Sequence, residues 1–447
     1  MVMDLHAILE DLNPWWRDPG RRRASAYPER RDLQPTVVER LGDLESRRAT
    51  IVRGPRQVGK TVLLLQVADE LLDKGWVPAN LTYFDFSDDR LTEEVTARQV
   101  AEISPPGFED ESPRVFLFDE VSKAPRWDRW LKQAVDRREG RIVVTDSSAS
   151  LLRGGAVESG QGRWDELSLD GLSFREYLRF NRPGERGEAT IARAPQLLQR
   201  YLDVGGFPGF AHHSDPQEVW RLLRSDIAER AILRDLARHV NKLDAVRDLF
   251  VYLVQDSGAR FNSAARASDL GADDRSVRNW LRLLVETCLL VPLPLLPMST
   301  KASSRLRAQS SPKVYAVDHG LVAAFSVWPD RMDQEARGRL YETVVFAHLR
   351  VLARKLGSEL HYFRERDRHE VDFIVQSERG KTAIEVTASP RIRPERLRRL
   401  MDAKDRAGAD RTLLVYGGLV QADEGTGRVP LARFLMDPAE ALEGAIG

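Results

Sequence analysis

The segment GPRQVGKT, at positions 54–61, has the spacing G-x-x-x-x-G-K-T. Its glycines permit a tight turn in which backbone N–H groups surround phosphate oxygens. An apolar strand, ATIVRG, is predicted before this loop and a helix, KTVLLLQVADELLDKG, after it, which is the context that the motif requires. We therefore predict a site for ATP and Mg²⁺. The expected nucleotide-binding residues of the loop are Gly54, Pro55, Arg56, Gln57, Val58, Gly59, Lys60, Thr61 and Val62.

The segment VFLFDE, at 115–120, supplies acids for the same chemistry. Its four apolar residues predict a buried strand that ends at Asp119 and Glu120. Asp119 is expected to bind nucleotide and, with Thr61, to hold Mg²⁺, whereas Glu120 can orient or deprotonate the attacking water. Lys60 is expected to contact the β- and γ-phosphates. An acidic pair alone is usually a solvated strand end, but the phosphate loop favours catalysis here.

Two further residues are candidates for contact with phosphate. A strand, RIVVTD, is followed by the serines of TDSSAS at 145–150. A polar side chain at the carboxyl end of that strand would lie beside the γ-phosphate, so Ser147 is a catalytic candidate and Ser148 its neighbour. Arg163 is a weaker candidate for binding the nucleotide, since an arginine on a solvated loop explains it equally well.

The composition describes an ordinary globular protein with 42% hydrophobic and 30% charged residues among 447. Lys plus Arg and Asp plus Glu both total 68, so overall charge predicts neither a nucleic-acid nor a membrane partner. The single cysteine, Cys288, excludes a disulfide framework and a zinc site built on cysteines. With no secretory signal and no apolar run of about 18 residues, we expect a cytoplasmic protein without a membrane partner.

Strands and helices must position these residues. From 49 to 150 they alternate, which predicts an α/β fold with a parallel sheet and ligand loops at the carboxyl strand ends. Four parts are predicted: a helix and arginine-rich arm, a phosphate-loop domain, a mostly helical region and a smaller α/β domain. Their expected boundaries are 1–35, 36–180, 181–335 and 336–447.

A second acidic pattern lies in EVDFIVQSERGKTAIEVTAS, at 370–389. Asp372 and Glu385 each fall inside a short apolar strand. A metal site is one explanation, and an ordinary hairpin at a solvent-exposed edge is another.

The motifs together resemble the bacterial and archaeal AAA-type ATPases that carry a C-terminal domain of unknown function 4143. The resemblance depends on the order of RGPRQVGKT, FLFDE, TDSSAS, LSFREYL, YLDVGGFPG, SDIAERAILRDL, SVRNWLRLLVETCLLV, KVYAVDHGL, GRLYETVVFAHL, FRERDRHEVDFIV and AIEVTAS along most of the chain. It implies an AAA-type ATPase domain, a helical and winged-helix-like region and a restriction-endonuclease-like α/β domain. Asp146 departs from the family, which tends to have glycine there.

The nuclease-like part of this resemblance implies a metal-binding line of Glu342, Asp372 and Glu385, with a lysine two residues after Glu385. Carboxylates would hold Mg²⁺, which activates water, and the lysine would add positive charge beside the phosphate. Position 387 is instead threonine. Lys381 points to the same side as Glu385 but lies about 13 Å from it along the strand, at about 3.3 Å per residue, which is too far for a direct substitute. We therefore favour a fold that is kept for structure, for binding or for regulated metal affinity over a competent nuclease.

The helix predicted in ADDRSVRNWLRLLVETCLLV, at 272–291, has an apolar face and a basic face. The apolar positions are Val277, Trp280, Leu281, Leu284 and Val285. Arg275, Arg278 and Arg282, here called the arginine face, fall on the other side and could dock against DNA phosphates. A solvated helix, or one packed on its own ATPase domain, is the alternative interpretation.

Three functions follow. The first is an ATP-hydrolysing molecular switch whose C-terminal domains engage a protein or DNA partner, as a monomer or an oligomer. The second is an ATP-regulated, metal-dependent DNA nuclease. The third is a regulatory partner in a toxin–antitoxin or defence system that binds nucleotide without turnover. Glu120 favours turnover, and Thr387 disfavours the nuclease.

Overall fold

The computed structural model describes residues 4–445 apart from 44, 47, 92, 106–112, 147–161, 182–187, 233–235, 238, 298–310, 327–332, 366–368 and 419–426. The chain forms two compact units, Met1–Leu169 and Asp170–Gly447. Among the described residues, no helix combines the length and apolarity needed to cross a membrane. The four predicted domain boundaries remain predictions.

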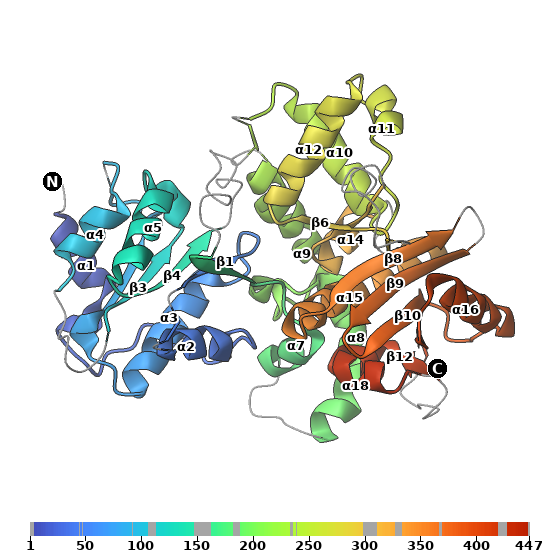
Figure 1. Cartoon of the computed structure of the whole chain (residues 1–447), viewed down its shortest axis with the longest axis horizontal. Helices are drawn as coiled ribbons and strands as arrows, with labels where there is room; N and C mark the ends of the chain where they lie inside the picture. The colour runs from blue at the N-terminus through green and yellow to red at the C-terminus, as the bar shows by residue number, and fades with distance from the viewer. Residues whose placement is uncertain are drawn as a thin grey trace. The chain divides into compact units, whose positions relative to one another are not determined.

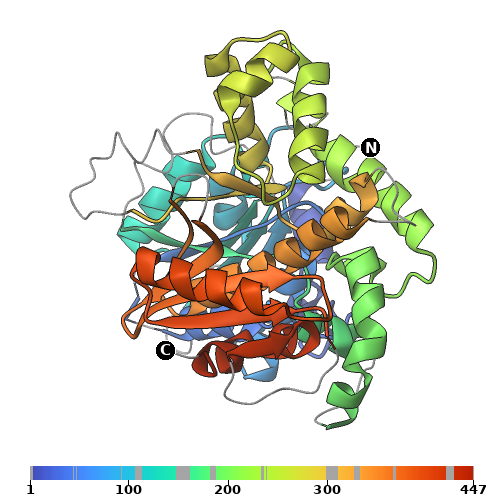
Figure 2. The same cartoon turned by 90° about the vertical axis from the view of Figure 1, so that its right-hand side faces the viewer.

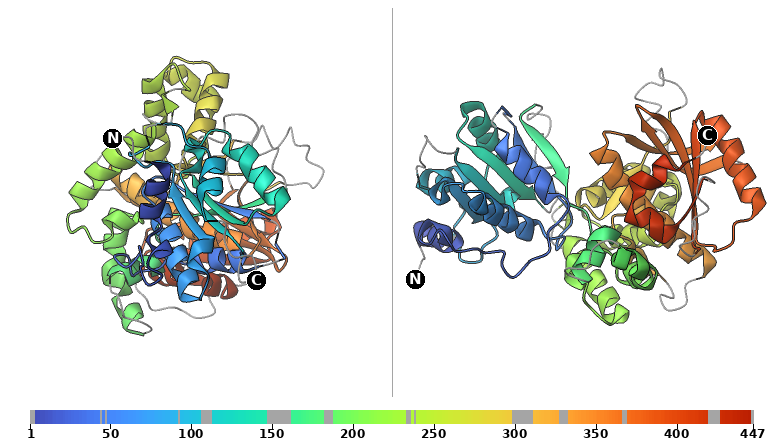
Figure 3. Two further views of the ribbon diagram at one scale, coloured as in Figure 1. Left: turned by 90° about the vertical axis from the view of Figure 1, so that its left-hand side faces the viewer. Right: turned by 90° about the horizontal axis from the view of Figure 1, so that it is seen from below.

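Unit 1 is built on a five-stranded parallel sheet in the order β2-β3-β4-β1-β5. Helices lie on both faces of the sheet (Figures 1 and 3). Strands buried on both faces are near-continuous apolar runs, and β3 is apolar from Val115 to Phe118, before Asp119 at its end. The sheet confirms the predicted parallel α/β architecture. Its elements are α1 (Leu5–Leu12), η1 (Pro14–Trp16), α2 (Gln34–Gly42), β1 (Ala49–Arg53), α3 (Lys60–Asp73), η2 (Pro78–Asn80), β2 (Leu81–Asp85), α4 (Ala97–Ile103), β3 (Val115–Asp119), η3 (Val121–Lys123), α5 (Trp127–Arg137), β4 (Arg141–Asp146) and β5 (Trp164–Ser168).

The arginine-rich segment before the sheet packs along α3. The Asp69 carboxylate of α3 accepts hydrogen bonds from the backbone N–H groups of Arg23 and Ala24, at 3.2 and 2.8 Å. Gln66, also on α3, donates to the carbonyls of Tyr27 and Glu29, at 2.8 and 2.9 Å. The helix that follows the phosphate loop is therefore held by polar side chains as well as by apolar packing.

Unit 2 contains a helical part, a two-stranded antiparallel sheet and a five-stranded mixed sheet. Its first elements are α7 (Phe174–Asn181), α8 (Glu188–Val204), η5 (Pro208–Phe210), α9 (Pro216–Leu222), the π-helix η6 (Leu223–Glu229), α10 (Leu243–Gln255), α11 (Ser263–Asp269), α12 (Asp274–Glu286), β6 (Leu290–Leu293), β7 (Lys313–Ala316) and α14 (His319–Phe325). The others are α15 (Gln334–Lys355), β8 (Glu359–Glu365), β9 (His369–Ser377), β10 (Gly380–Thr387), α16 (Pro394–Ala407), β11 (Arg411–Tyr416), β12 (Arg428–Pro430), α17 (Leu431–Met436) and α18 (Pro438–Glu443).

The mixed sheet has the order β12-β11-β10-β9-β8, with antiparallel pairing from β8 to β10 and parallel pairing from β10 to β12. The helix α16 lies across one face of it (Figure 2). The helix α15 also packs on β8, β9 and β10. The two predicted strands around EVDFIVQSERGKTAIEVTAS are β9 and β10, joined by a tight turn at Gly380, which has φ of 109°.

A buried carboxylate explains two glycine-containing motifs, YLDVGGFPG and KVYAVDHGL. Asp318, which is 4% exposed, accepts hydrogen bonds from the backbone N–H groups of Gly206 and Gly320, both at 2.8 Å. A Cβ atom at Gly205 would lie 2.3 Å from the Asp318 carboxylate. Glycine is therefore required for the chain to approach this acid.

Candidate functional site

The phosphate loop connects β1 to α3 with a backbone that only certain residues can adopt. Gln57 and Gly59 have φ of 60° and 96°, and α3 begins at Lys60 directly after Gly59. A Cβ atom at Gly54 would lie 2.2 Å from the Leu169 carbonyl oxygen. Both glycines of the motif are therefore needed: Gly59 adopts the left-handed backbone, and Gly54 leaves room for the Leu169 carbonyl. The loop precedes a helix N-terminus, where phosphate is favoured.

Lys60 lies folded against its own loop. Its side chain is buried, and Nζ donates to the carbonyl oxygens of Gly54 and Pro55, both at 3.0 Å. These neutral acceptors keep the ammonium beside the positions where phosphate would bind. A second cation supports the loop, since Arg31 Nη1 donates to the Val58 carbonyl at 2.9 Å. Sequence reasoning missed Arg31, because only the fold brings it to the loop.

Asp119 is the centre of the polar contacts at the carboxyl end of β3. Thr61 Oγ1 donates to its Oδ2 at 2.5 Å, and the Tyr83 hydroxyl donates to the same atom at 3.4 Å. Thr145 donates to Oδ1. Burial raises the pKa of Asp119, although these hydroxyl bonds oppose the shift. Hydroxyl and carboxylate oxygens are ligands that Mg²⁺ prefers, so Thr61 and Asp119 fit the predicted ion.

Glu120 begins the turn after β3 with φ of 49° and ψ of 43°. Its backbone N–H donates to Thr145 Oγ1 at 3.0 Å. Thr145 on β4 thus fixes both acids of the pair, a role that the sequence analysis did not assign to it. The signal was present, since Thr145 is a polar residue near the end of a buried strand.

The other two phosphate candidates have different outcomes. Ser147 lies outside the described residues, directly after β4 ends at Asp146. Arg163 is not brought to the loop. Its carbonyl accepts from Ala49 N–H at the beginning of β1, and its Nε donates to Asp136 at 2.8 Å. The phosphate loop follows the opposite end of β1, so the structure supports the solvated-surface interpretation of Arg163.

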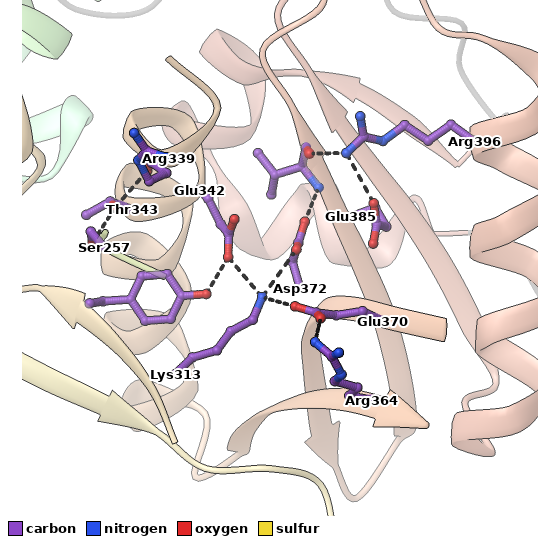
Figure 4. Close-up of polar contacts among 12 residues, drawn as sticks. Ser257, Lys313, Arg339, Glu342, Thr343, Arg364, Glu370, Asp372, Glu385 and Arg396 are labelled. Atoms are coloured by element: carbon purple, nitrogen blue, oxygen red, sulfur yellow. Dashed lines mark hydrogen bonds and ion pairs between the residues drawn. The ribbon is translucent and has the colours of Figure 1, made fainter. Parts of the chain in front are cut away.

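The acids predicted as a second metal site do gather in unit 2. Ile384 pairs with Phe373 in the ladder of β9 and β10, which places Glu385 beside Asp372 at the next position. Glu342 projects toward them from α15 (Figure 4). Burial and the nearby Asp372 raise the pKa of both glutamates, to about 7 for Glu342 and well above its ordinary value for Glu385.

A lysine from β7 lies within this carboxylate cluster. Lys313 Nζ is 2.9 Å from Glu370, 3.2 Å from Glu342 and 3.5 Å from Asp372. Burial would lower the pKa of Lys313, but Tyr315 and the carboxylates raise it well above its ordinary value. In the part of the chain that the structure describes, no three His, Cys, Asp or Glu side chains are arranged to hold a metal. Glu342, Asp372 and Glu385 therefore do not fit the predicted ion.

An arginine stands beside the position where the resemblance implied a lysine. Arg396 of α16 donates through Nη1 to Thr387 Oγ1 at 3.0 Å and through Nη2 to the Val386 carbonyl at 2.9 Å. Its Nη2 is also 3.4 Å from Glu385 Oε2. The sequence did not predict Arg396 as a member of the carboxylate cluster.

The arginine face lies on α12 as expected, with Arg275, Arg278 and Arg282 exposed. Arg278 forms an ion pair with Asp274 one turn earlier. The buried face differs slightly from the prediction, because Leu283 is buried whereas Leu281 and Val285 are only half-buried. Leu283 lies beside Leu284 on the helix and faces the interior with it.

Three protein-family models match successive parts of the chain. Residues 46–178 match an AAA domain, 195–331 match domain of unknown function 8612, and 337–434 match domain of unknown function 4143. The AAA match and the parallel sheet with its phosphate loop support ATP binding by an AAA-type ATPase domain.

The chain is also similar to uncharacterized proteins. One from Methanocaldococcus jannaschii is 23% identical over 347 residues, which is 75% of this chain and 74% of the relative. One from Haemophilus influenzae is 23% identical over 279 residues, which is 61% of this chain and 67% of the relative.

Among solved structures, a match to the RuvB Holliday junction branch migration motor of Thermotoga maritima covers 59% of this chain and 89% of that one, at 17% identity and a TM-score of 0.27. A match to the Orc1 protein of Aeropyrum pernix, solved in complex with DNA, covers 67% of this chain and 93% of that one, at 11% identity and a TM-score of 0.32. At these scores the likeness carries no functional argument.

Proposed function

We propose that this protein is an ATP-hydrolysing molecular switch. The observation that carries the proposal is the convergence of Lys60, Thr61 and Asp119, with Glu120 adjacent, at the carboxyl ends of β1 and β3. The 2.5 Å bond from Thr61 to Asp119 supports this grouping, since it joins the two motifs directly. A phosphate loop and an acidic strand end that meet in this way have the parts needed for phosphoryl transfer to water.

Each residue has a distinct role in the proposed reaction. Lys60 exchanges the carbonyls of Gly54 and Pro55 for phosphate oxygens, which are stronger acceptors because they are charged. Thr61 and Asp119 hold Mg²⁺, which when bound stabilises charge on the phosphates. Glu120 orients the attacking water, and Thr145 keeps Glu120 and Asp119 in fixed relation.

The test is nucleotide binding followed by turnover. Lys60→Ala should lose ATP binding in a fluorescence titration. Lys123→Ala should retain it, because Lys123 is an exposed lysine after the same strand β3. Equal ATP affinity in the parent and Lys60→Ala would refute the assignment of the loop.

The partner of the switch is proposed to be DNA. The arginine face on α12 and the arginines at 391, 393, 398 and 399, around the start of α16, support this proposal because they are exposed on the surface, where phosphates can reach them. The helices α10 to α12 followed by β6 and β7 have the element order of a winged helix. A protein partner, and assembly into an oligomer, are the alternatives for the same surfaces.

Two other functions remain as alternatives. The restriction-endonuclease-like interpretation of the C-terminal sheet would make the protein an ATP-regulated nuclease with Glu342, Asp372 and Glu385 as its metal ligands, but Lys313 already lies against the first two of these acids. A regulatory partner of a toxin–antitoxin or defence system would bind ATP without turnover. A DNA cleavage assay with Mn²⁺ distinguishes the first, and phosphate release distinguishes the second.

A further inference from the structure

The Lys313 ammonium lies at the centre of the carboxylate cluster, where it forms ion pairs with three acids. Its contacts of 2.9, 3.2 and 3.5 Å are directed at three different carboxylates. A lysine ammonium has three N–H donors, so the three acids can all be hydrogen-bonded at once. Figure 4 shows Nζ between Glu342, Asp372 and Glu370.

The ammonium is placed there by secondary structure. Lys313 is the first residue of β7, where it pairs with Leu293 of β6. The next residue, Val314, is fixed on its other edge, since its carbonyl accepts from Gly258 N–H at 2.8 Å and its N–H donates to the Ala259 carbonyl at 3.1 Å. The side chain is 3% exposed. The Lys313 ammonium could therefore leave the cluster only if β7, which is hydrogen-bonded on both edges, moved as well.

The acids depend on this cation in turn. Glu342 and Asp372 have side chains only 19% and 15% exposed. A buried charge is costly unless a partner of opposite charge is hydrogen-bonded to it. The hydroxyl of Tyr315, two residues after Lys313 on β7, donates to Glu342 at 2.6 Å, so β7 supplies a second donor to the same acid.

We propose that Lys313 replaces a divalent cation in this cluster, and that the cluster is a metal-independent ionic joint between the β6–β7 sheet and the C-terminal sheet. The parent protein then binds no divalent cation at Glu342, Asp372 and Glu385. Removing the ammonium leaves Glu342, Glu370 and Asp372 without their shared cation, so that they can hold a divalent ion in its place. This joint is independent of the ATPase proposal, because its residues lie entirely in unit 2.

The test is a gain of metal binding by Lys313→Met, which keeps an unbranched side chain of similar length without the charge. Thermal unfolding would be measured without nucleotide at increasing Mn²⁺, since Thr61 and Asp119 offer a separate ion site. We expect the Tm of Lys313→Met to fall without metal and to rise by at least about 4 °C with saturating Mn²⁺. Adding Asp372→Asn to this variant should remove the rise.

Lys381→Met is the matched control. Lys381 is a partly exposed lysine on β10 that is not in the cluster, so its replacement should leave the response to Mn²⁺ as in the parent. No stabilisation of Lys313→Met by Mn²⁺ would overturn the proposal.

A second measurement uses the parent protein and does not depend on the variant folding. Electron paramagnetic resonance would count Mn²⁺ bound to the parent and to Asp372→Asn. The proposal predicts equal binding. Mn²⁺ bound by the parent and lost in Asp372→Asn would overturn it, since the ion would then bind with Lys313 present.

Discussion

Lowering the pH should destabilise unit 2 through one buried histidine. His348 lies within α15, where its Nε2 accepts a hydrogen bond from Phe174 N–H at 3.0 Å and its Nδ1–H donates to the Val344 carbonyl at 2.8 Å. Protonation of Nε2 would remove that acceptor and leave a charge buried. Burial lowers the pKa of His348 from 6.5 to about 4.

The direction and size of this pH effect on stability follow from the difference in proton binding between the folded and unfolded chain. Because the pKa is lower in the folded protein, the unfolded chain binds the proton first as the pH falls. The stabilisation is present above pH 6.5 and is lost progressively as the pH falls toward 4. A difference of about 2.5 pKa units, at 1.36 kcal/mol per unit, corresponds to a loss on the order of 3 kcal/mol.

The assay is urea unfolding of the parent and His348→Gln at several pH values between 7.5 and 4. An amide oxygen at 348 can accept the Phe174 bond but does not titrate. The difference between the two proteins isolates the histidine. Taking this difference is necessary because burial raises the pKa of Glu342 to about 7, so that the contribution of Glu342 to stability changes with pH in the opposite direction.

We expect the free energy of unfolding of the parent, relative to His348→Gln, to fall as the pH is lowered through this range. His212→Gln removes an exposed histidine and should follow the parent. A difference between the parent and His348→Gln that does not change with pH would refute the reasoning.

Three other predictions follow from the structure. Gly54→Ala should weaken ATP binding and destabilise unit 1 by about 1–3 kcal/mol, because its Cβ would lie 2.2 Å from the Leu169 carbonyl; Gly42→Ala, which meets nothing within 4 Å, is the control for an ATP titration and thermal unfolding. Asp318→Ala should destabilise unit 2 by about 2–5 kcal/mol, because it leaves two buried N–H donors without an acceptor; a loss in urea unfolding below about 0.5 kcal/mol would contradict this. If the arginine face contacts DNA phosphates, replacing its three arginines by alanine should reduce the salt slope of log binding by up to about 2.7; an unchanged slope would exclude that face.

The residues of the proposed nucleotide site could be named from the sequence because they lie in two short segments. The loop from Gly54 to Thr61 is contiguous, and Asp119 and Glu120 are marked by the apolar strand before them. The parallel sheet could be predicted because each strand and helix has its own hydrophobic pattern. Such patterns do not give the order of strands, which is what brings Thr145 beside Asp119.

The carboxylate cluster was predicted less completely for the same reason. Glu342, Asp372 and Glu385 could be named from motifs, but the cations that neutralise them could not. Lys313 is 29 residues before Glu342 and 59 before Asp372, on a strand outside the C-terminal sheet. Arg396 reaches Thr387 only because α16 lies against β10. Lys313 is far from these acids in the chain, and Arg396, although only 9 residues after Thr387, reaches it through the packing of a helix on a strand, which no motif of the sequence marks.

The central claim is that this protein hydrolyses ATP and that Glu120 orients the water. The most direct test is a single-turnover measurement of phosphate release, with excess enzyme over ATP and Mg²⁺, comparing the parent with Glu120→Gln. The parent should release phosphate, whereas Glu120→Gln should bind ATP with similar affinity and release phosphate at least about 100-fold more slowly. Phosphate release at the same rate by both proteins would contradict the role of Glu120, and ATP binding without any release by the parent would contradict turnover itself.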